Sequence, residues 1–375
     1  MSSAVRSALA LAVGARVPVL LWGGAGLGKS SAVREMAAQA GLPCETVIAS
    51  IREPSDFAGL PIVADDGVSV HFAPPSWARR LADAGSGVLF LDEISTAPPA
   101  VQAALLRVVL ERTVGDLELP AEVAVVAAAN PPEQAADGWD LSPPLANRFC
   151  HLDWNLSAAE WSEGIMAGFS QPAVPDLPED LMRRELTAAR AGTAAFVIAR
   201  SHLLHAHPGN ESAAGRAWPS PRSWEMAARL VAACAVSGGD AETRALLIAG
   251  AVGPAAAAEY LAWQEDLDLP DPEAVLRNPA SFRLPERGDR AYAALTAITA
   301  AVLADNTAER WEAAWEAISA VTESRQADIA MAAVRTLVVH RPDGAAPPPD
   351  VLIKMAPVLR TAGLFERLTG GLARS

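Results

Sequence analysis

The chain has 375 residues, and 51% of them are apolar, which is enough for two or three domains with hydrophobic cores. Its formal net charge of −14 at pH 7 disfavours nonspecific attraction to DNA, because that attraction depends on Lys and Arg side chains that neutralise phosphates. Three widely spaced cysteines, in neither a CxxC motif nor a Cys/His pair, indicate reduced thiols and no zinc site.

Neither a secretion signal nor a membrane span is expected. The alanine-rich start, Met1 to Val13, lies only ten residues ahead of a glycine-rich loop, and cleavage of a leader there would damage the domain that carries it. The weakly polar stretch Ala245–Ala262 is interrupted by Pro254 and contains Glu259, which predicts a packed pair of helices. We therefore expect a cytoplasmic protein.

Short apolar runs alternate with helical patterns from about residue 17 to 155, which is typical of a parallel sheet covered by helices. Five strands are predicted, at Val17–Trp22, Cys44–Ser50, Gly87–Asp92, Glu122–Asn130 and Phe149–Trp154. The predicted fold class is α/β, with a five-stranded parallel sheet and helices on both faces.

From about residue 156 onward the pattern is helical. Three domains are predicted: an α/β domain, a helical lid and an all-α C-terminal domain, at residues 1–155, 156–268 and 286–375. Proline-rich segments at Asp268–Pro285 and Pro342–Asp350 are predicted linkers. Trp311 and Trp315 lie four residues apart, which favours a packing stripe over a binding groove.

The segment after the first predicted strand matches the pattern G-x-x-x-x-G-K-[ST]. It reads Gly23, Gly24, Ala25, Gly26, Leu27, Gly28, Lys29 and Ser30, and Ser31 follows in a predicted helix. The glycines let successive backbone N–H groups point at phosphates, Lys29 adds a positive charge, and Ser30 offers a hard oxygen ligand for Mg²⁺. A nucleotide-binding loop is predicted. A chance glycine-rich turn and a dinucleotide-binding loop are weaker alternatives.

Asp92 and Glu93 end a fully apolar strand in the segment GVLFLDEIS. Successive strand residues point in different directions, so Asp92 can hold Mg²⁺ while Glu93 faces the γ-phosphate and polarises the attacking water. The alternative is a carboxylate pair that only caps the strand. The phosphate loop in the same chain favours the catalytic interpretation.

With these two motifs the chain resembles the AAA+ ATPases, and more narrowly the MoxR-type ATPases of the dynein-related branch that carries an insert in helix 2. The resemblance covers roughly residues 15–235 and implies a P-loop NTPase fold with ATP and Mg²⁺ as cofactors. The segment VAVVAAANPPE resembles the family's sensor 1, so Asn130 would hydrogen-bond the γ-phosphate or the lytic water. An Asn that ends a strand in a turn is the alternative.

Two arginines are assigned by the same resemblance. LSPPLANRFC resembles the element that supplies the arginine finger, which makes Arg148 the candidate that reaches a neighbour's nucleotide. Many relatives have Asp before this Arg, and here Asn147 stands there instead, so a plain strand-flanking Arg remains open. WPSPRSWEMAARL resembles sensor 2, in which Arg222 would touch the γ-phosphate from the lid; a solvated Arg is the alternative.

Two hairpin-like inserts also fit the family. GLPIVADDGVSVHFAPP has a strong turn signal at Asp65-Asp66-Gly67 and matches the helix 2 insert, and ERTVGDLELP matches the hairpin before sensor 1. In relatives such hairpins face the ring's centre or a partner. They are candidate substrate contacts here, and ordinary surface hairpins are the open alternative.

The resemblance implies a homo-oligomeric ring, expected to be a hexamer, that uses ATP hydrolysis to remodel or assemble a protein partner. MoxR-type ATPases commonly act on partners with a von Willebrand factor A-like domain, and this chain shows none of its own, so a separate partner chain is expected. Nucleic acid and membrane are not expected partners.

Two other functions remain open. A DNA-associated AAA+ motor is disfavoured by the acidic charge, and an ATP-gated scaffold with little turnover is disfavoured by Glu93. GTP is disfavoured as the nucleotide because the guanine-reading [NT]KxD element needs a lysine. The only spare one, Lys354, lies in LIKMA.

Overall fold

The computed structural model describes residues 3–131, 139–169, 172–266, 269–323, 327–361 and 363–369. The chain divides into two compact units. Unit one comprises Met1–Pro178 and Leu203–Glu259, and unit two comprises Glu179–His202 and Tyr260–Ser375. The division into three domains at 1–155, 156–268 and 286–375 remains a prediction.

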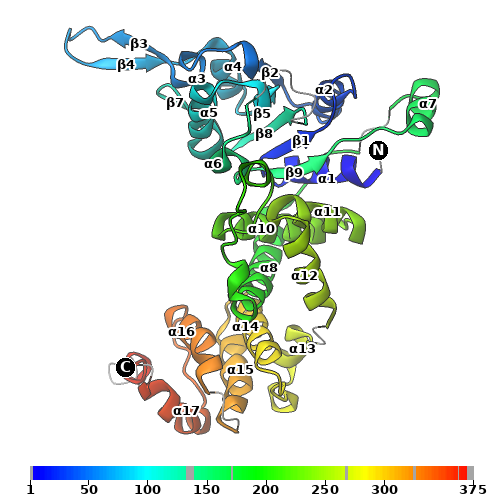
Figure 1. Cartoon of the computed structure of the whole chain (residues 1–375). Coiled ribbons are helices and arrows are strands. Elements are labelled where there is room, and N and C mark those ends of the chain that lie inside the picture. The colour runs from blue at the N-terminus through cyan, green and yellow to red at the C-terminus, as the bar shows by residue number, and fades with distance from the viewer. Residues whose placement is uncertain are drawn as a thin grey trace. The chain divides into compact units, whose positions relative to one another are not determined.

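Unit one is built on a five-stranded parallel sheet (Figure 1). The strands lie in the order β2-β5-β8-β1-β9. Their bounds are β1 (Val19–Trp22), β2 (Cys44–Ile48), β5 (Ser86–Asp92), β8 (Glu122–Ala129) and β9 (Cys150–Asp153). The predicted fold class and all five predicted strands are confirmed, and the strand ends differ from the prediction by one or two residues.

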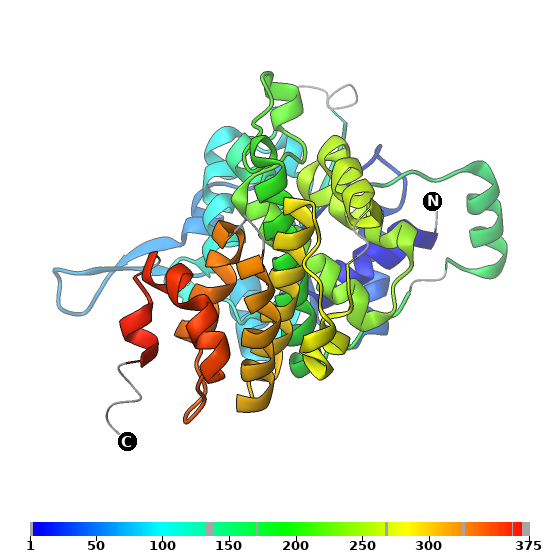
Figure 2. The ribbon, with the colours of Figure 1, turned by 90° about the horizontal axis from the view of Figure 1, so that it is seen from below.

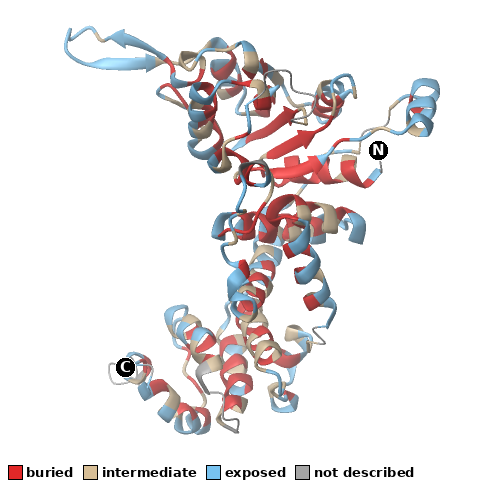
Figure 3. Ribbon diagram, viewed as in Figure 1, coloured by how far each residue is buried: buried red, intermediate tan, exposed pale blue. Residues whose placement is uncertain are grey.

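The central strands are apolar along their whole length because helices cover both faces of the sheet. Val88 to Leu91 in β5 are fully buried, and so is nearly all of β8 from Val123 to Ala129 (Figure 3). Parallel pairing aligns Leu89 with Val125 and Leu20 with Ala127. The carboxyl ends of all five strands therefore meet at one edge of the sheet.

Helices of unit one surround this sheet. Helix α1 packs against α10, α11, β8 and β9, while α3, α4 and α5 contribute to the core on the side of β5. Their bounds are α1 (Ser3–Gly14), α2 (Lys29–Gln39), α3 (Ser55–Ala58), α4 (Ser76–Ala84), α5 (Pro99–Glu111), α6 (Pro143–Ala146), α7 (Ala158–Ala167), α9 (Glu211–Ala214), α10 (Pro221–Ser237) and α11 (Ala241–Val252). Helix α12 (Pro254–Asp266) begins after Gly253, so Ala245–Ala262 does hold two helices. No helix among the described residues has both the length and the apolar content to span a membrane.

Both predicted hairpins are present. Strands β3 (Leu60–Val63) and β4 (Val70–Ala73) form the first, which extends away from the sheet of unit one (Figures 1 and 2). Asp66 accepts hydrogen bonds from the backbone of Val68 and Ser69 and so fixes the turn. The hairpin's large apolar side chains are exposed, at Leu60, Ile62, Val63, Val68, Val70 and Phe72.

The second hairpin docks on the base of the first. It consists of β6 (Thr113–Val114) and β7 (Leu117–Glu118). The backbone N–H of Phe72 donates to the Asp116 carboxylate at 2.6 Å, and the N–H of Asp116 donates to the carbonyl oxygen of Phe72 at 3.0 Å. A Cβ on Gly115 would lie 2.4 Å from that same carbonyl oxygen, so only glycine permits this approach. The two inserts are thus joined at their bases.

Unit two is helical throughout its described residues. Besides the C-terminal part of α12 it contains α8 (Glu179–Ala199), α13 (Pro272–Arg277), α14 (Gly288–Ala304), α15 (Ala308–Ile318), α16 (Met331–Val339), α17 (Pro349–Thr361) and α18 (Phe365–Thr369). Trp311 and Trp315 are fully buried, and Trp311 Nε1 donates to the carbonyl oxygen of Leu337 at 2.8 Å, which confirms a packing stripe. Helix α13 lies within the proline-rich segment 268–285, and its Val275 and Leu276 belong to this core.

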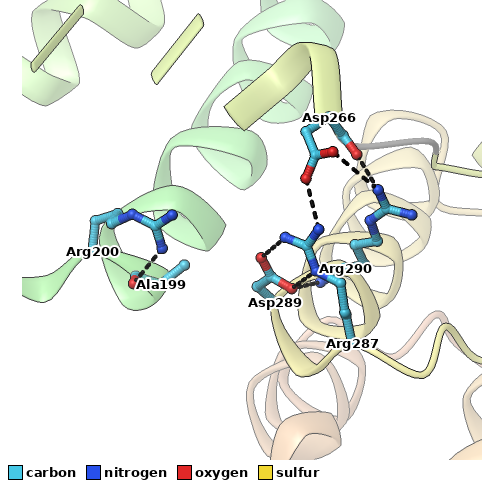
Figure 4. A network of polar contacts seen from close by, with 6 residues as sticks. All are labelled: Ala199, Arg200, Asp266, Arg287, Asp289 and Arg290. Atoms are coloured by element: carbon cyan, nitrogen blue, oxygen red, sulfur yellow. Dashed lines mark hydrogen bonds and ion pairs between the residues drawn. The ribbon is translucent and has the colours of Figure 1, made fainter. Parts of the chain in front are cut away.

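Charged residues join the C-terminal end of α12 to the start of α14 (Figure 4). Arg287 pairs with Asp266 at 2.6 Å and with Asp289 at 2.7 Å, while Arg290 lies 3.5 Å from Asp266. Arg287 and Asp266 are 49% and 59% exposed, so their ion pair contributes little by itself. The network orients the two helix ends relative to each other within unit two.

Asn147 ties the turn before β9 to the helical part of unit one. Its side chain is buried, with 4% of its surface exposed. Its Nδ2 donates to the carbonyl oxygen of Trp218 at 3.0 Å, and its Oδ1 accepts from the hydroxyl of Ser220, the N-cap residue of α10, at 2.6 Å. A carbonyl oxygen can only accept, so the residue that faces Trp218 must carry a donor. Asn supplies both groups and ionised Asp supplies one.

We expect Asn147→Asp to lower the free energy of unfolding by about 2 kcal/mol, because a buried carboxylate would face the carbonyl oxygen of Trp218 without a proton to share. Urea unfolding at pH 7 measures this loss. The matched control is Asn210→Asp: Oδ1 of the exposed Asn210 accepts from Ala213 N at 2.7 Å, and Asp retains that bond. Equal stability of the two variants would contradict the role given to Asn147.

Candidate functional site

The glycine-rich loop lies between β1 and α2, at the carboxyl edge of the sheet. Gly26 and Gly28 have φ of 81° and 80°, a region that favours glycine, and Gly28 directly precedes the first residue of α2. Gly23 is required for a different reason, because a Cβ there would lie 2.4 Å from the carbonyl oxygen of Trp154. The loop wraps the N-terminal end of α2, where backbone N–H groups and the helix dipole attract anions.

Lys29, the first residue of α2, is buried at the centre of the loop, with 7% of its surface exposed. Its ammonium donates to the carbonyl oxygens of Gly23 and Gly24, and to Oδ1 of Asn130 at 3.1 Å. Burial lowers the pKa of Lys29, while the negative charges of Asp92 and Glu93 act to raise it. The structure thus brings together Lys29 and Asn130, which are about a hundred residues apart in the sequence.

Ser30 and Asp92 are the second pair that the structure brings together. The hydroxyl of Ser30 donates to Asp92 Oδ2 at 2.7 Å, and Asp92 Oδ1 accepts from the backbone N–H of Glu93 at 3.0 Å. A hydroxyl and a carboxylate are both hard oxygen donors, the type that Mg²⁺ prefers. The residues present therefore fit a magnesium ion beside the loop.

Glu93 departs from the strand geometry of Asp92. Its φ is 58° and its ψ is 40°, a left-handed conformation that is uncommon outside glycine. The turn is held by a hydrogen bond from Thr96 Oγ1 to the Glu93 carbonyl oxygen at 2.9 Å. The exposed carboxylate accepts from Ser50 Oγ at 2.5 Å. Ser50 follows the end of β2, and no motif in the sequence indicated it.

Two other residues support the site without having been predicted. The buried hydroxyl of Ser95 accepts from the backbone N–H of Asn130 at 3.1 Å and lies 3.4 Å from its carbonyl oxygen, so it holds Asn130 in place. The fully buried Trp154 follows β9 and donates from Nε1 to the carbonyl oxygen of Leu27 at 3.1 Å. Both residues follow strand ends, which is the only sequence signal that marks them.

Arg148 and Arg222 lie apart from the hydrogen bonds of Lys29, Ser30 and Asp92 within the described residues. Arg148 is half-buried and donates to the carbonyl oxygen of Pro144. Its pKa is lowered first by burial and then by the positive charge of Arg222, so the two guanidinium groups are electrostatic neighbours. Arg222 is exposed in the first turn of α10. Ser31, also assigned to the loop, is exposed on α2.

The site thus combines an anion-attracting loop after β1, a pair of magnesium-type oxygen ligands on Ser30 and Asp92, and an exposed carboxylate on Glu93, directly after β5. Gly26 and Gly28 have open space around the positions of a Cβ, so the loop presents backbone to solvent. A phosphorylated ligand with a bound divalent cation matches these donors. The carboxylate of Glu93 can accept a proton from water next to that ligand.

Comparison with known proteins gives one family match. Residues 18–149 match the AAA domain, dynein-related subfamily. No curated protein sequence matches the chain.

Three solved structures resemble this one distantly. A candidate ATPase from Cytophaga hutchinsonii is 19% identical, with a TM-score of 0.41 over 65% of this chain and 79% of that one. A full-length MCM homolog from Methanopyrus kandleri is 20% identical, with a TM-score of 0.38 over 65% of this chain and 55% of that one. NtrX from Brucella abortus is 18% identical, with a TM-score of 0.29 over 48% of this chain and 44% of that one. The match over residues 18–149 indicates that this part of the chain is similar to the AAA domain of the dynein-related subfamily.

Proposed function

We propose that this chain is a Mg²⁺-dependent ATPase of the MoxR type that uses hydrolysis to remodel or assemble a protein partner. Two contacts carry the proposal: Ser30 to Asp92 at 2.7 Å, and Lys29 to Asn130 at 3.1 Å. They join the glycine-rich loop to the ends of β5 and β8. A phosphate-binding and water-activating site requires such residues to converge.

In the proposed reaction ATP and water give ADP and phosphate. The loop and Lys29 bind the β- and γ-phosphates, and Ser30 and Asp92 hold Mg²⁺, which when bound would neutralise charge on the phosphate oxygens. Glu93 accepts a proton from the attacking water. The oxygen of that water bonds to the γ-phosphorus, while the bond between the γ-phosphorus and the oxygen that leaves with ADP breaks. Asn130 donates a hydrogen bond to the γ-phosphate or to the attacking water.

We assign Arg148 and Arg222 to the charge that builds on the phosphate during transfer. Arg222 would act from the lid of the same subunit, and Arg148 would reach the nucleotide of a neighbour in a ring, expected to be a hexamer. Both assignments come from the family resemblance.

The partner is proposed to be a protein, and the von Willebrand factor A-like class remains the expectation from the resemblance. The exposed apolar side chains of the β3–β4 hairpin offer a surface of the kind that contacts proteins. The net charge of −14 disfavours nucleic acid. A cytoplasmic location remains a prediction.

Glu93→Gln is expected to lower the steady-state rate of ATP hydrolysis at least about 100-fold and to leave ATP binding intact, because the amide cannot accept the proton of water. A coupled assay of ADP release measures the rate, and calorimetry measures binding. Glu111→Gln, which removes the same charge from an exposed residue at the end of α5, serves as the control. Undiminished hydrolysis in Glu93→Gln would refute the assignment of the base.

Lys29→Ala and Arg148→Ala separate binding from assembly. Lys29→Ala should lose ATP binding, because the only side-chain cation in the loop is removed.

Arg148→Ala should still form the ring in Mg·ATP, measured by light scattering, and hydrolyse ATP up to about 1000-fold more slowly. Normal hydrolysis by Arg148→Ala in the assembled state would exclude it as the finger.

Ser50→Ala is expected to raise basal hydrolysis several-fold. The 2.5 Å hydrogen bond occupies Oε2 of Glu93, and the carboxylate must give it up or share it to accept a proton from water. Steady-state kinetics at saturating ATP test this expectation, with Thr46→Ala, an exposed residue of the preceding strand β2, as the control. Slower hydrolysis in Ser50→Ala would instead mean that Ser50 aims Glu93 at the water.

A further inference from the structure

Arg216 places a positive charge beside the glycine-rich loop, from a position that no motif marks. It lies in the connection between α9 and α10, six residues before Arg222. Its guanidinium carbon lies 4.2 Å from the ring centroid of Trp22. Trp22 ends β1 and directly precedes Gly23, so this cation is fixed next to the first residue of the loop.

A cavity of about 450 Å³ opens between Arg216 and the loop. It is lined by the loop residues Gly23, Gly24, Ala25 and Leu27, and by Pro131, Asp153, Asn155 and Arg216. Lys29 contacts the carbonyl oxygens of Gly23 and Gly24, and Pro131 follows Asn130. The cavity therefore lies at the end of the loop that carries the Lys29–Asn130 contact. All of its lining residues belong to unit one.

The hydrogen-bonding capacity of Arg216 exceeds what the described protein atoms use. Arg216 Nη1 donates to Asp153 Oδ1 at 2.9 Å, and a guanidinium has five N–H donors. The side chains of Arg216 and Asp153 are 41% and 70% exposed, so their ion pair is weak. A phosphate can accept two parallel hydrogen bonds from one guanidinium and competes well with such a partner.

The neighbouring His151 does not share this positive charge near pH 7. Its Nδ1 accepts from Trp22 Nε1 at 2.8 Å, and its Nε2 lies 2.9 Å from the carbonyl oxygen of Ala146, which requires a proton on Nε2. Burial lowers the pKa of His151 to about 4. The neutral ring orients Trp22, and the cation on this wall of the cavity is Arg216.

We propose that Arg216 binds the terminal phosphate of the nucleotide within its own subunit, and that it exchanges Asp153 for that phosphate when ATP binds. This inference rests on the proposed function and adds a phosphate ligand that the family resemblance did not indicate. Arg222 does not line the cavity. A group that binds only the terminal phosphate distinguishes ATP from ADP.

The test compares the dissociation constants of Mg·ATP and Mg·ADP, measured by calorimetry in the Glu93→Gln background so that ATP persists. Arg216→Ala should raise the constant for ATP about tenfold and change that for ADP less than about twofold. Arg216→Lys should recover part of the lost ATP affinity, because lysine retains the positive charge but cannot donate two parallel hydrogen bonds as a guanidinium does. Arg80→Ala, which breaks an exposed ion pair with Glu45 in the same unit, is the control and should change neither constant.

Asp153→Asn is expected to change the dissociation constant of Mg·ATP in the direction opposite to that of Arg216→Ala. Removal of the competing carboxylate should tighten ATP binding several-fold, although it breaks an ion pair of the folded protein. A purely structural ion pair predicts no such gain. Unchanged or weaker ATP binding in Asp153→Asn would contradict the exchange.

Equal effects of Arg216→Ala on ATP and ADP, or no effect on either, would overturn the assignment while the proposed function stands. If the Glu93→Gln protein binds neither nucleotide, the proposed function fails, and the role of Arg216 fails with it. ATP-selective weakening in Arg216→Ala together with tighter binding in Asp153→Asn supports the proposal.

Discussion

The parallel pairing of the five strands is the constraint on which the site depends. Strands that run in one direction end at one edge, and β8 lies between β1 and β5. The glycine-rich loop after β1, Asp92 at the end of β5 and Asn130 after β8 must therefore meet. The hydrogen bonds from Ser30 to Asp92 and from Lys29 to Asn130 are the local consequence. Ser50 after β2 reaches Glu93 for the same reason, and so extends the site to a fourth strand.

The helical part of unit one is attached to the turn before β9 by specific polar contacts. Asn147 donates to Trp218 and accepts from Ser220, the N-cap of α10, and so links the residue before Arg148 to the helix that begins next to Arg222. This explains the departure from the Asp that the resemblance implies, because a carboxylate cannot donate to a carbonyl oxygen. Arg216 comes from the connection between α9 and α10. It lies beside Asp153 at the carboxyl end of β9, whereas Arg148 precedes the amino end of that strand.

Features that follow from local patterns could be predicted from the sequence. The loop, the five strands and both hairpins were predicted because glycine spacing, apolar runs and turn residues lie within short segments. Contacts between distant segments could not be predicted in this way. Ser95 binds Asn130 across 35 residues, Trp154 binds Leu27 across 127, and Asp116 binds Phe72 across 44. Serine, tryptophan and aspartate occur at many positions without such a role, so only the folded geometry distinguishes Ser95, Trp154 and Asp116 from other residues of the same types.

The most direct test of the central claim is a crystal structure of the Glu93→Gln protein with ATP and Mg²⁺. The expected density has the β- and γ-phosphates wrapped by the loop from Gly23 to Gly28 and bonded to Lys29 Nζ, with Mg²⁺ bound to Ser30 Oγ and near Asp92. Nucleotide density elsewhere on the chain, with Lys29 still bonded to Asn130 and to the loop carbonyls, would contradict the assignment of this edge as the ATP site.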